Sequence, residues 1–169
     1  ISTRFVVEES IERDSMLTAQ FVQAIGEAEI RHASITPTRT MAEMLDPRND
    51  NAYPDVDPGA RASSRIEFLD HVEHLPDILL ATVYALDRTV VWSTNPELIG
   101  VRIENDEELD ESFEMKTAVS TSYHEIDGER PEQRLLREPQ YLFIENYVPM
   151  FNADKSKVIA MVEIYKEPV

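Results

Sequence analysis

Residues 78–100 constrain this chain most, because they predict two paired strands, of which the first lies in the middle of a sheet. Ile78 to Leu86 is apolar at both parities, which is typical of a strand covered on both faces. Thr89 to Thr94 is β-branched and aromatic and is followed by a proline. We expect a tight turn at Asp87-Arg88 between the two strands. A second, sharp turn is expected at Gly100, since glycine accepts a positive φ at little cost.

The end of this stretch resembles a known family. Trp-Ser-Thr-Asn-Pro-Glu-Leu-Ile-Gly at 92–100 looks like part of the Cache domains, the PAS-like extracytoplasmic sensor domains of bacterial receptors. Residues 145–168, from Glu-Asn-Tyr-Val-Pro-Met-Phe to Glu-Ile-Tyr-Lys-Glu-Pro, are similar to the last hairpin of those domains. The similarity covers roughly 75–168 by motif. Cache domains usually carry glycines in that hairpin, where this chain has Ser156 and Ala160.

The resemblance implies an α+β fold, in which a long N-terminal helix and short helices pack on a five-stranded antiparallel PAS-like sheet. Residues 1–169 would form one extracytoplasmic sensor domain. Its parts are an N-terminal helix (1–34), a helical and loop segment (35–76) and the PAS-like sheet (77–169). The length of the chain suits a single domain with one good core.

The N-terminal segment from Glu8 to Ala33 predicts one long helix, because it has no proline and is rich in helix formers. Leu17, Phe21 and Ile25 form an apolar stripe at helical spacing. Two interpretations stay open: the stripe packs on the sheet, or the first half of the helix projects from the domain and pairs with a second subunit.

The other helices are shorter. A brief helix is predicted from Thr40 to Leu45. Asp57 is a good N-cap, and Pro58 a good first residue, for a helix that runs to about Leu75. We expect its inner side to carry Ile66, Leu69 and Val72.

The C-terminal part predicts the rest of the sheet. Residues 107–117 are expected to be helical, and the second half of 117–126 an edge strand before a turn at Asp127-Gly128. Residues 141–151 and 157–165 are expected to be the last two strands, the final one apolar on both faces apart from Glu163.

Composition excludes several classes of function. A net charge of -17 argues against nucleic acid and anionic membrane surfaces as partners, since both bind basic patches. The absence of cysteine excludes disulfides, a thiol nucleophile and a zinc–thiolate site. No apolar run approaches the roughly 20 residues that span a bilayer. If the resemblance holds, the domain is periplasmic, and membrane helices of an inner-membrane parent protein flank both of its ends.

Metal binding is a weak prediction at two places. His71 and His74 are three residues apart on a predicted helix, a spacing that can bring two imidazoles near one ion, but no third ligand is evident. The acidic run 104–114 could hold Ca²⁺ or Mg²⁺, although it lacks a calcium-loop pattern. A solvated helix face is the simpler explanation of this run. The weak candidates are Asp106, Glu107, Asp110 and Glu111.

No catalytic motif or phosphate loop is present, so we expect neither enzymatic activity nor a cofactor in this domain. By resemblance, the parent protein is a histidine kinase or a diguanylate cyclase.

In Cache domains the ligand lies on one face of the sheet. Mapped residue by residue, that face draws here on Tyr84, Trp92, Thr94, Arg102, Tyr123, Glu145 and Tyr147. Arg102 would suit a carboxylate, because a guanidinium binds it as a fork, although an ion pair with Glu104 or Asp106 is an equal alternative. Glu145 facing a pocket would instead favour an amine or an ordered water over a carboxylate. Core packing is the simple alternative for the aromatic residues.

The resulting hypothesis is a small-molecule sensor domain that transmits occupancy to membrane helices. The alternatives are a structural or dimerisation module, with a possible homodimer through the N-terminal helix, and an acidic surface that senses divalent cations.

Overall fold

The computed structural model describes residues 2–33, 35, 39–123 and 143–167. A long helix, α1 (Ser2–His32), precedes two short elements, α2 (Met41–Met44) and the 3₁₀ turn η1 (Pro47–Asn49). α3 (Pro58–Glu73) then leads into the sheet. The remaining elements are β1 (Ile78–Ala85), β2 (Val90–Ser93), η2 (Pro96–Leu98), α4 (Glu107–Met115), β3 (Val119–Tyr123), β4 (Phe143–Phe151) and β5 (Val158–Lys166).

The strands form one antiparallel sheet in the order β2-β1-β5-β4-β3. The two strands that are apolar at both parities, β1 and β5, lie inside the sheet, and β3 forms an edge as predicted. The predicted α+β fold, with a long N-terminal helix, short helices and a five-stranded PAS-like sheet, is therefore confirmed. The turn predicted at Asp127-Gly128 lies outside the described residues.

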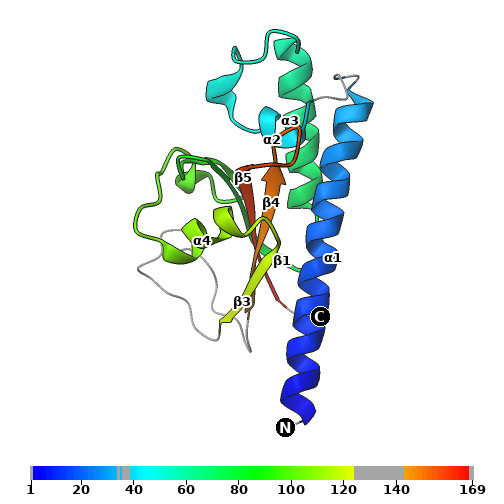
Figure 1. The fold of residues 1–169 in the computed structure, drawn as a ribbon, viewed down its shortest axis with the longest axis vertical. Helices are drawn as coiled ribbons and strands as arrows, with labels where there is room; N and C mark the ends of the chain where they lie inside the picture. The colour runs from blue at the N-terminus through cyan, green and yellow to red at the C-terminus, as the bar shows by residue number, and fades with distance from the viewer. Residues whose placement is uncertain (1, 34, 36–38, 124–142, 168–169) are drawn as a thin grey trace.

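Two layers of helix cover the sheet. α1, α2 and α3 pack on one face, and α4 packs on the other through β4 and β5 (Figure 1). We call the face that α1, α2 and α3 cover the helical face, and the face that α4 covers the α4 face. The first turns of α1 extend beyond the end of the sheet (Figure 1). In the described part of the chain, no helix combines the length and the apolar character that crossing a bilayer requires.

Local sequence signals account for the ends of these elements. Asp57 caps α3 by accepting a hydrogen bond from the backbone N–H of Ala60 at 3.1 Å. Gly100 has a φ of 93°, as the turn after β2 was expected to need. In the β4–β5 turn, Lys155 takes the left-handed conformation, with a φ of 60°.

One predicted inner face needs correction. Ile66 on α3 is 64% exposed, whereas Leu69 and Val72 are buried as expected. In the α1 stripe, Leu17 and Phe21 are 58% and 55% exposed and do not pack on the sheet, whereas Ile25 is partly buried against the core of the helical face. The face of α1 that is buried carries smaller side chains, namely Ser15, Ala19, Val22, Gly26 and Ile30.

Candidate functional site

Five polar side chains meet inside the protein on the α4 face of the sheet. We call them the carboxylate–tyrosine cluster: Tyr84, Glu145, Tyr147, Glu163 and Tyr165. Each is at most 1% exposed. Tyr147 and Tyr165 donate hydrogen bonds to Oε2 of Glu145 at 3.0 and 2.5 Å. Tyr84 donates to Oε1 of Glu163 at 2.9 Å.

The register of the sheet creates this cluster. Alternation along β4 sends Glu145 and Tyr147 to the same face, and alternation along β5 does the same for Glu163 and Tyr165. The pairing of the strands sets Glu145 opposite Tyr165 and Tyr147 opposite Glu163. Directly opposed residues project to one face, so acids and phenols alternate across two central strands.

The chemistry of the cluster is unusual for the middle of a sheet. Burying a carboxylate is costly unless hydrogen bonds satisfy it, and the tyrosine hydroxyls supply such bonds here. The surrounding side chains are apolar and include Leu80, Phe113 and Phe143. A small cationic or amine-bearing molecule could reach these carboxylate and phenol oxygens only if the cluster opened, because each of its side chains is at most 1% exposed.

The sheet brings together three of the residues predicted for the ligand site, Tyr84, Glu145 and Tyr147. Trp92 is not among them. It pairs with Val83 and packs on the helical face, because opposed residues share a face and a shift of one residue reverses it. Thr94 is also elsewhere: its hydroxyl accepts a hydrogen bond from the backbone N–H of Ala81 at 3.1 Å.

The structure does not place the other two predicted residues, Arg102 and Tyr123, in the cluster. Arg102 is exposed and donates to the backbone carbonyl of Asp87 at 3.1 Å, so its guanidinium is not directed at the cluster. Tyr123 ends β3 at the edge of the sheet, and its side chain lies outside the described part of the chain.

Sequence reasoning missed Glu163 and Tyr165 as members of the site. A signal for Glu163 existed, since it is the acid within a strand that is otherwise apolar on both faces. Nothing in the local pattern distinguished Tyr165 from a core tyrosine.

The weak metal candidates do not converge. Asp106 caps α4 by accepting from the N–H of Leu109 at 3.1 Å, and Asp110 pairs with Arg88 at 2.7 Å. Glu107 and Glu111 are exposed. Among the described residues, no group of three possible ligands forms within this acidic run.

The two histidines do not share one group of possible metal ligands either. His71 lies with Glu29 and Glu67, and His74 lies with Asp70 and Glu73, the possible ligand atoms of each group being within 4.8 Å of one another. The two imidazoles therefore belong to different groups of donors.

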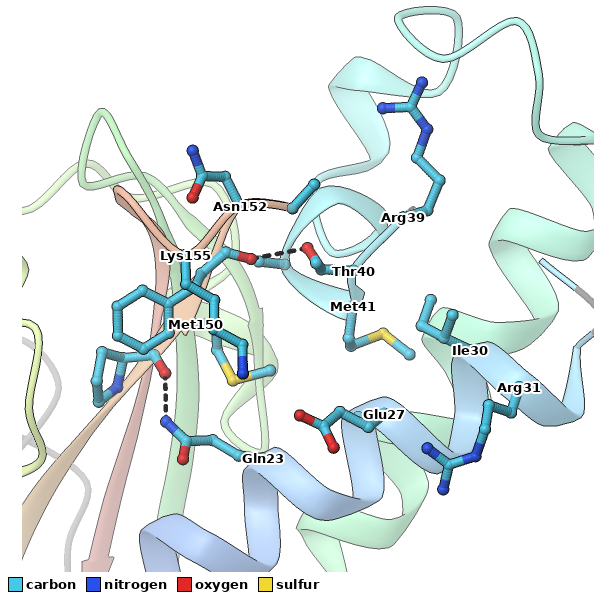
Figure 2. Close-up of a pocket in the computed structure, with 15 residues that line it drawn as sticks. Gln23, Glu27, Ile30, Arg31, Arg39, Thr40, Met41, Met150, Asn152 and Lys155 are labelled. Carbon is cyan, nitrogen blue, oxygen red and sulfur yellow. Dashed lines mark hydrogen bonds between the residues drawn. The ribbon is translucent and has the colours of Figure 1, made fainter. Parts of the chain in front are cut away.

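An open cavity of about 420 Å³ lies on the helical face (Figure 2). Its three walls are the end of α1, the start of α2 and the turn between β4 and β5. Figure 2 shows Glu27 and Lys155 directed toward the opening from opposite walls. Apolar side chains line much of it, among them Ile30, Met41 and Met150.

A second cavity, of about 500 Å³, lies beside the C-terminal end of β1. Its charged groups neutralise one another: Arg48 pairs with Asp46 at 2.9 Å and with Asp87 at 3.0 Å. The hydrogen bond from Arg48 holds the pKa of Asp87 well below its ordinary value. These charged groups are engaged in ion pairs with one another, so they are not available to bind a ligand.

The solved structures described here are distantly similar to this chain. No family model and no curated protein matches the chain. A sensory box sensor histidine kinase from Vibrio cholerae is 14% identical with a TM-score of 0.40, over 64% of this chain and 94% of that chain. An extracellular ligand binding receptor from Desulfohalobium retbaense DSM5692 is 13% identical with a TM-score of 0.42, over 91% of this chain and 24% of that chain. This chain thus spans about a quarter of the receptor. Because these sequence identities and TM-scores are low, the function has to be argued from the site.

Proposed function

We propose that this domain is the ligand-binding, extracytoplasmic input domain of a bacterial membrane receptor, most like those of sensor histidine kinases. The α4 face of the PAS-like sheet is its ligand site. The observation that carries the proposal is the carboxylate–tyrosine cluster, with two acids and three phenols fully buried at the centre of that face. A face that only had to pack against α4 would be more stable if it were apolar.

The ligand class follows from the groups on the site. Glu145 and Glu163 offer carboxylate oxygens, and the tyrosines offer hydroxyls that can donate or accept. A small organic amine matches these groups better than a carboxylate does. Arg102, the residue expected to favour a carboxylate, is exposed and points elsewhere.

The path of the signal follows from the way the two ends of the domain meet. Lys166, at the end of β5, forms an ion pair with Asp14 of α1 at 2.9 Å and donates to Thr18 at 3.3 Å. A ligand that binds two arrangements of the sheet unequally would therefore shift α1 relative to β5. Both elements would lead toward membrane helices of the parent protein.

A structural or dimerisation module is the second candidate. Two observations favour it: the cluster's hydroxyls are already bound to its acids, and α1 exposes Leu17 and Phe21. These two side chains line a cavity of about 350 Å³ with Leu75 and Pro76. A second copy of the chain could cover this surface to form a homodimer through α1, and sedimentation of the wild type against Phe21→Asp tests that arrangement.

Thermal-shift screening of the purified domain tests ligand binding. The panel contains organic amines, amino acids, small carboxylates and divalent cations, with and without chelator. An amine at a hundredfold excess over its Kd is expected to add about 2.7 kcal/mol of stability. For a chain of this size that corresponds to a rise in Tm of roughly 5–10 °C.

Variants locate the response. Glu145→Gln and Tyr147→Phe keep the shape of the site and remove one charge or one hydroxyl, so each is expected to reduce the shift. Arg102→Ala is the matched control outside the cluster and is expected to retain it. A response lost in Arg102→Ala but kept in Glu145→Gln would contradict the assignment, and a panel without any response would favour the structural module.

A further inference from the structure

We propose that the cavity of Figure 2 is a second binding site, for a small zwitterion with an apolar body. It lies on the helical face, opposite the carboxylate–tyrosine cluster, so it does not depend on the function proposed above. The cavity volume of about 420 Å³ falls within the roughly 300–1,000 Å³ of small-molecule sites.

The cavity exists because β3 is shorter than β4. The pairing of β3 with β4 ends at Val119 and Tyr147, so the last part of β4 has no neighbouring strand on that side. Pro149 has no N–H to leave unpaired there. Its carbonyl accepts from Nε2 of Gln23 at 2.9 Å, and the carbonyl of Phe151 accepts from Oγ1 of Thr40 at 2.7 Å. The strand edge is thereby satisfied by side chains, and it leaves a hollow rather than a site for another strand.

Gly26 shapes the floor of the hollow. A Cβ at this position would lie 3.2 Å from Cβ of Met41 and 3.4 Å from Cε of Met150. The absence of a side chain lets α1 approach α2 and β4 closely, and the apolar floor is completed by Ile30. This floor suits the apolar part of a ligand.

The opening carries one acid and one base on opposite walls. Glu27 projects from α1 and Lys155 from the β4–β5 turn, and both point toward the opening (Figure 2). Among the described residues, neither has an ion-pair partner within 4.0 Å. Lys155 is moreover held at a φ of 60°, a conformation that disfavours non-glycine residues. Two unpaired opposite charges above an apolar floor match a molecule with one ammonium and one carboxylate group.

Arg39 lines the same cavity but is not available to a ligand. Its guanidinium binds Asp55 through two hydrogen bonds, at 2.8 and 2.9 Å, and Glu43 through a third at 3.0 Å. The hydrogen bonding that Arg39 donates to Asp55 contributes most to raising the pKa of Arg39 above its ordinary value. Arg31, on the turn of α1 after Glu27, is exposed at the rim on the same wall as Glu27 (Figure 2).

Isothermal titration calorimetry with four probes tests the chemistry. L-Leucine and 6-aminohexanoate carry both charges, at short and long separation, and at least one of them is expected to bind. N-acetyl-L-leucine lacks the ammonium and L-leucinamide lacks the carboxylate, and both are expected to bind about tenfold more weakly or not at all. Equal binding of N-acetyl-L-leucine, or no binding of either zwitterion, would overturn the proposal.

Variants place the bound probe. Glu27→Ala and Lys155→Ala change exposed residues, so the fold should be retained, and each is expected to weaken zwitterion binding about tenfold. Glu12→Ala on α1 and Lys157→Ala after the same turn are matched controls outside the cavity, expected to leave binding unchanged. A zwitterion response lost in Glu145→Gln but kept in Lys155→Ala would move the binding to the α4 face and refute the second site alone.

Discussion

Arg61 is a cation with no exposed surface, at the start of α3. It donates to Asp50 at 2.5 Å, to the carbonyl of Asp46 at 2.9 Å and to the carbonyl of Glu43. It thereby closes the loop between α2 and α3. We predict that Arg61→Met lowers the free energy of unfolding by about 3 kcal/mol, because buried acceptors lose their donor. Urea denaturation followed by circular dichroism measures the change.

Arg48→Met is the matched control. Arg48 also pairs with two acids, Asp46 and Asp87, but half of its side chain is exposed, so its loss is expected to cost at most about 1 kcal/mol. Equal costs for the two substitutions would show that burial of Arg61 is not what makes its contacts strong.

Acid is expected to destabilise the same loop. Burial alone would raise the pKa of Asp50, but the hydrogen bonds from Arg65 and Arg61 outweigh it and lower that pKa. A carboxyl with a lowered folded-state pKa contributes stability above its unfolded pKa of about 4 and loses it as pH falls through the folded value. We predict that stability declines below about pH 4 and that the decline is shallower in Asp50→Asn. Urea midpoints between pH 2 and 7 measure both slopes, and parallel slopes would contradict the assignment.

Single residues divide into those that the sequence could place and those that it could not. Arg61, Ser64, Phe68 and Val72 follow helical spacing, so the burial of Arg61 was open to prediction from its stripe. The face of the sheet on which Trp92 lies was not open to prediction, because it depends on the register between β1 and β2. The Glu27 and Lys155 pair had no local signal, since only tertiary packing brings α1 to the β4–β5 turn.

At the scale of elements, the C-terminal end of α4 has a strained backbone conformation that a substitution can relieve. Its C-cap, Lys116, has a φ of 59°, a left-handed conformation that glycine adopts without strain. Lys116→Gly is expected to raise the free energy of unfolding by up to about 1 kcal/mol. Urea denaturation measures it. Lys157→Gly is the control, because Lys157 has no positive φ and gains nothing from glycine. A loss of stability in Lys116→Gly would mean that its side chain contributes more than the strain costs.

The elements themselves were largely predictable, and the packing face of α1 was not. Strands that are apolar at both parities, turns at glycine and a capped α3 each leave a local signal in the chain. α1 has two faces that could pack: a stripe of large side chains at Leu17 and Phe21, and a face of smaller ones at Ala19 and Val22. The sheet takes the smaller face, which lets the helix lie close to β4. Periodicity alone gives no reason to choose it.

At the scale of the whole molecule, the sheet separates two chemically different regions. The α4 face holds the buried acids and phenols, and the helical face holds the open cavity beside α1. Both regions involve β4, which contributes Glu145 to one and Met150 to the other. A ligand bound at either proposed site would therefore contact the strand that α1 packs against.

The ion pair between Asp14 and Lys166 joins α1 to the last strand, and its two members differ in burial. The side chain of Lys166 is 8% exposed and that of Asp14 is 33% exposed. Removing Asp14 leaves a cation that is poorly hydrated, whereas Lys166→Met leaves an acid whose side chain is one-third exposed, although its Oδ2 is buried. We predict a cost of about 2 kcal/mol for Asp14→Ala and under about 1 kcal/mol for Lys166→Met, measured by urea denaturation. Hydrogen exchange over residues 11–18 should accelerate in both variants but not in Glu12→Ala, since Glu12 is an exposed acid without an ion pair to another described residue. The reverse order of costs, with unchanged exchange, would mean that this contact does not hold α1 to the sheet, and the path proposed for the signal would lose its connection.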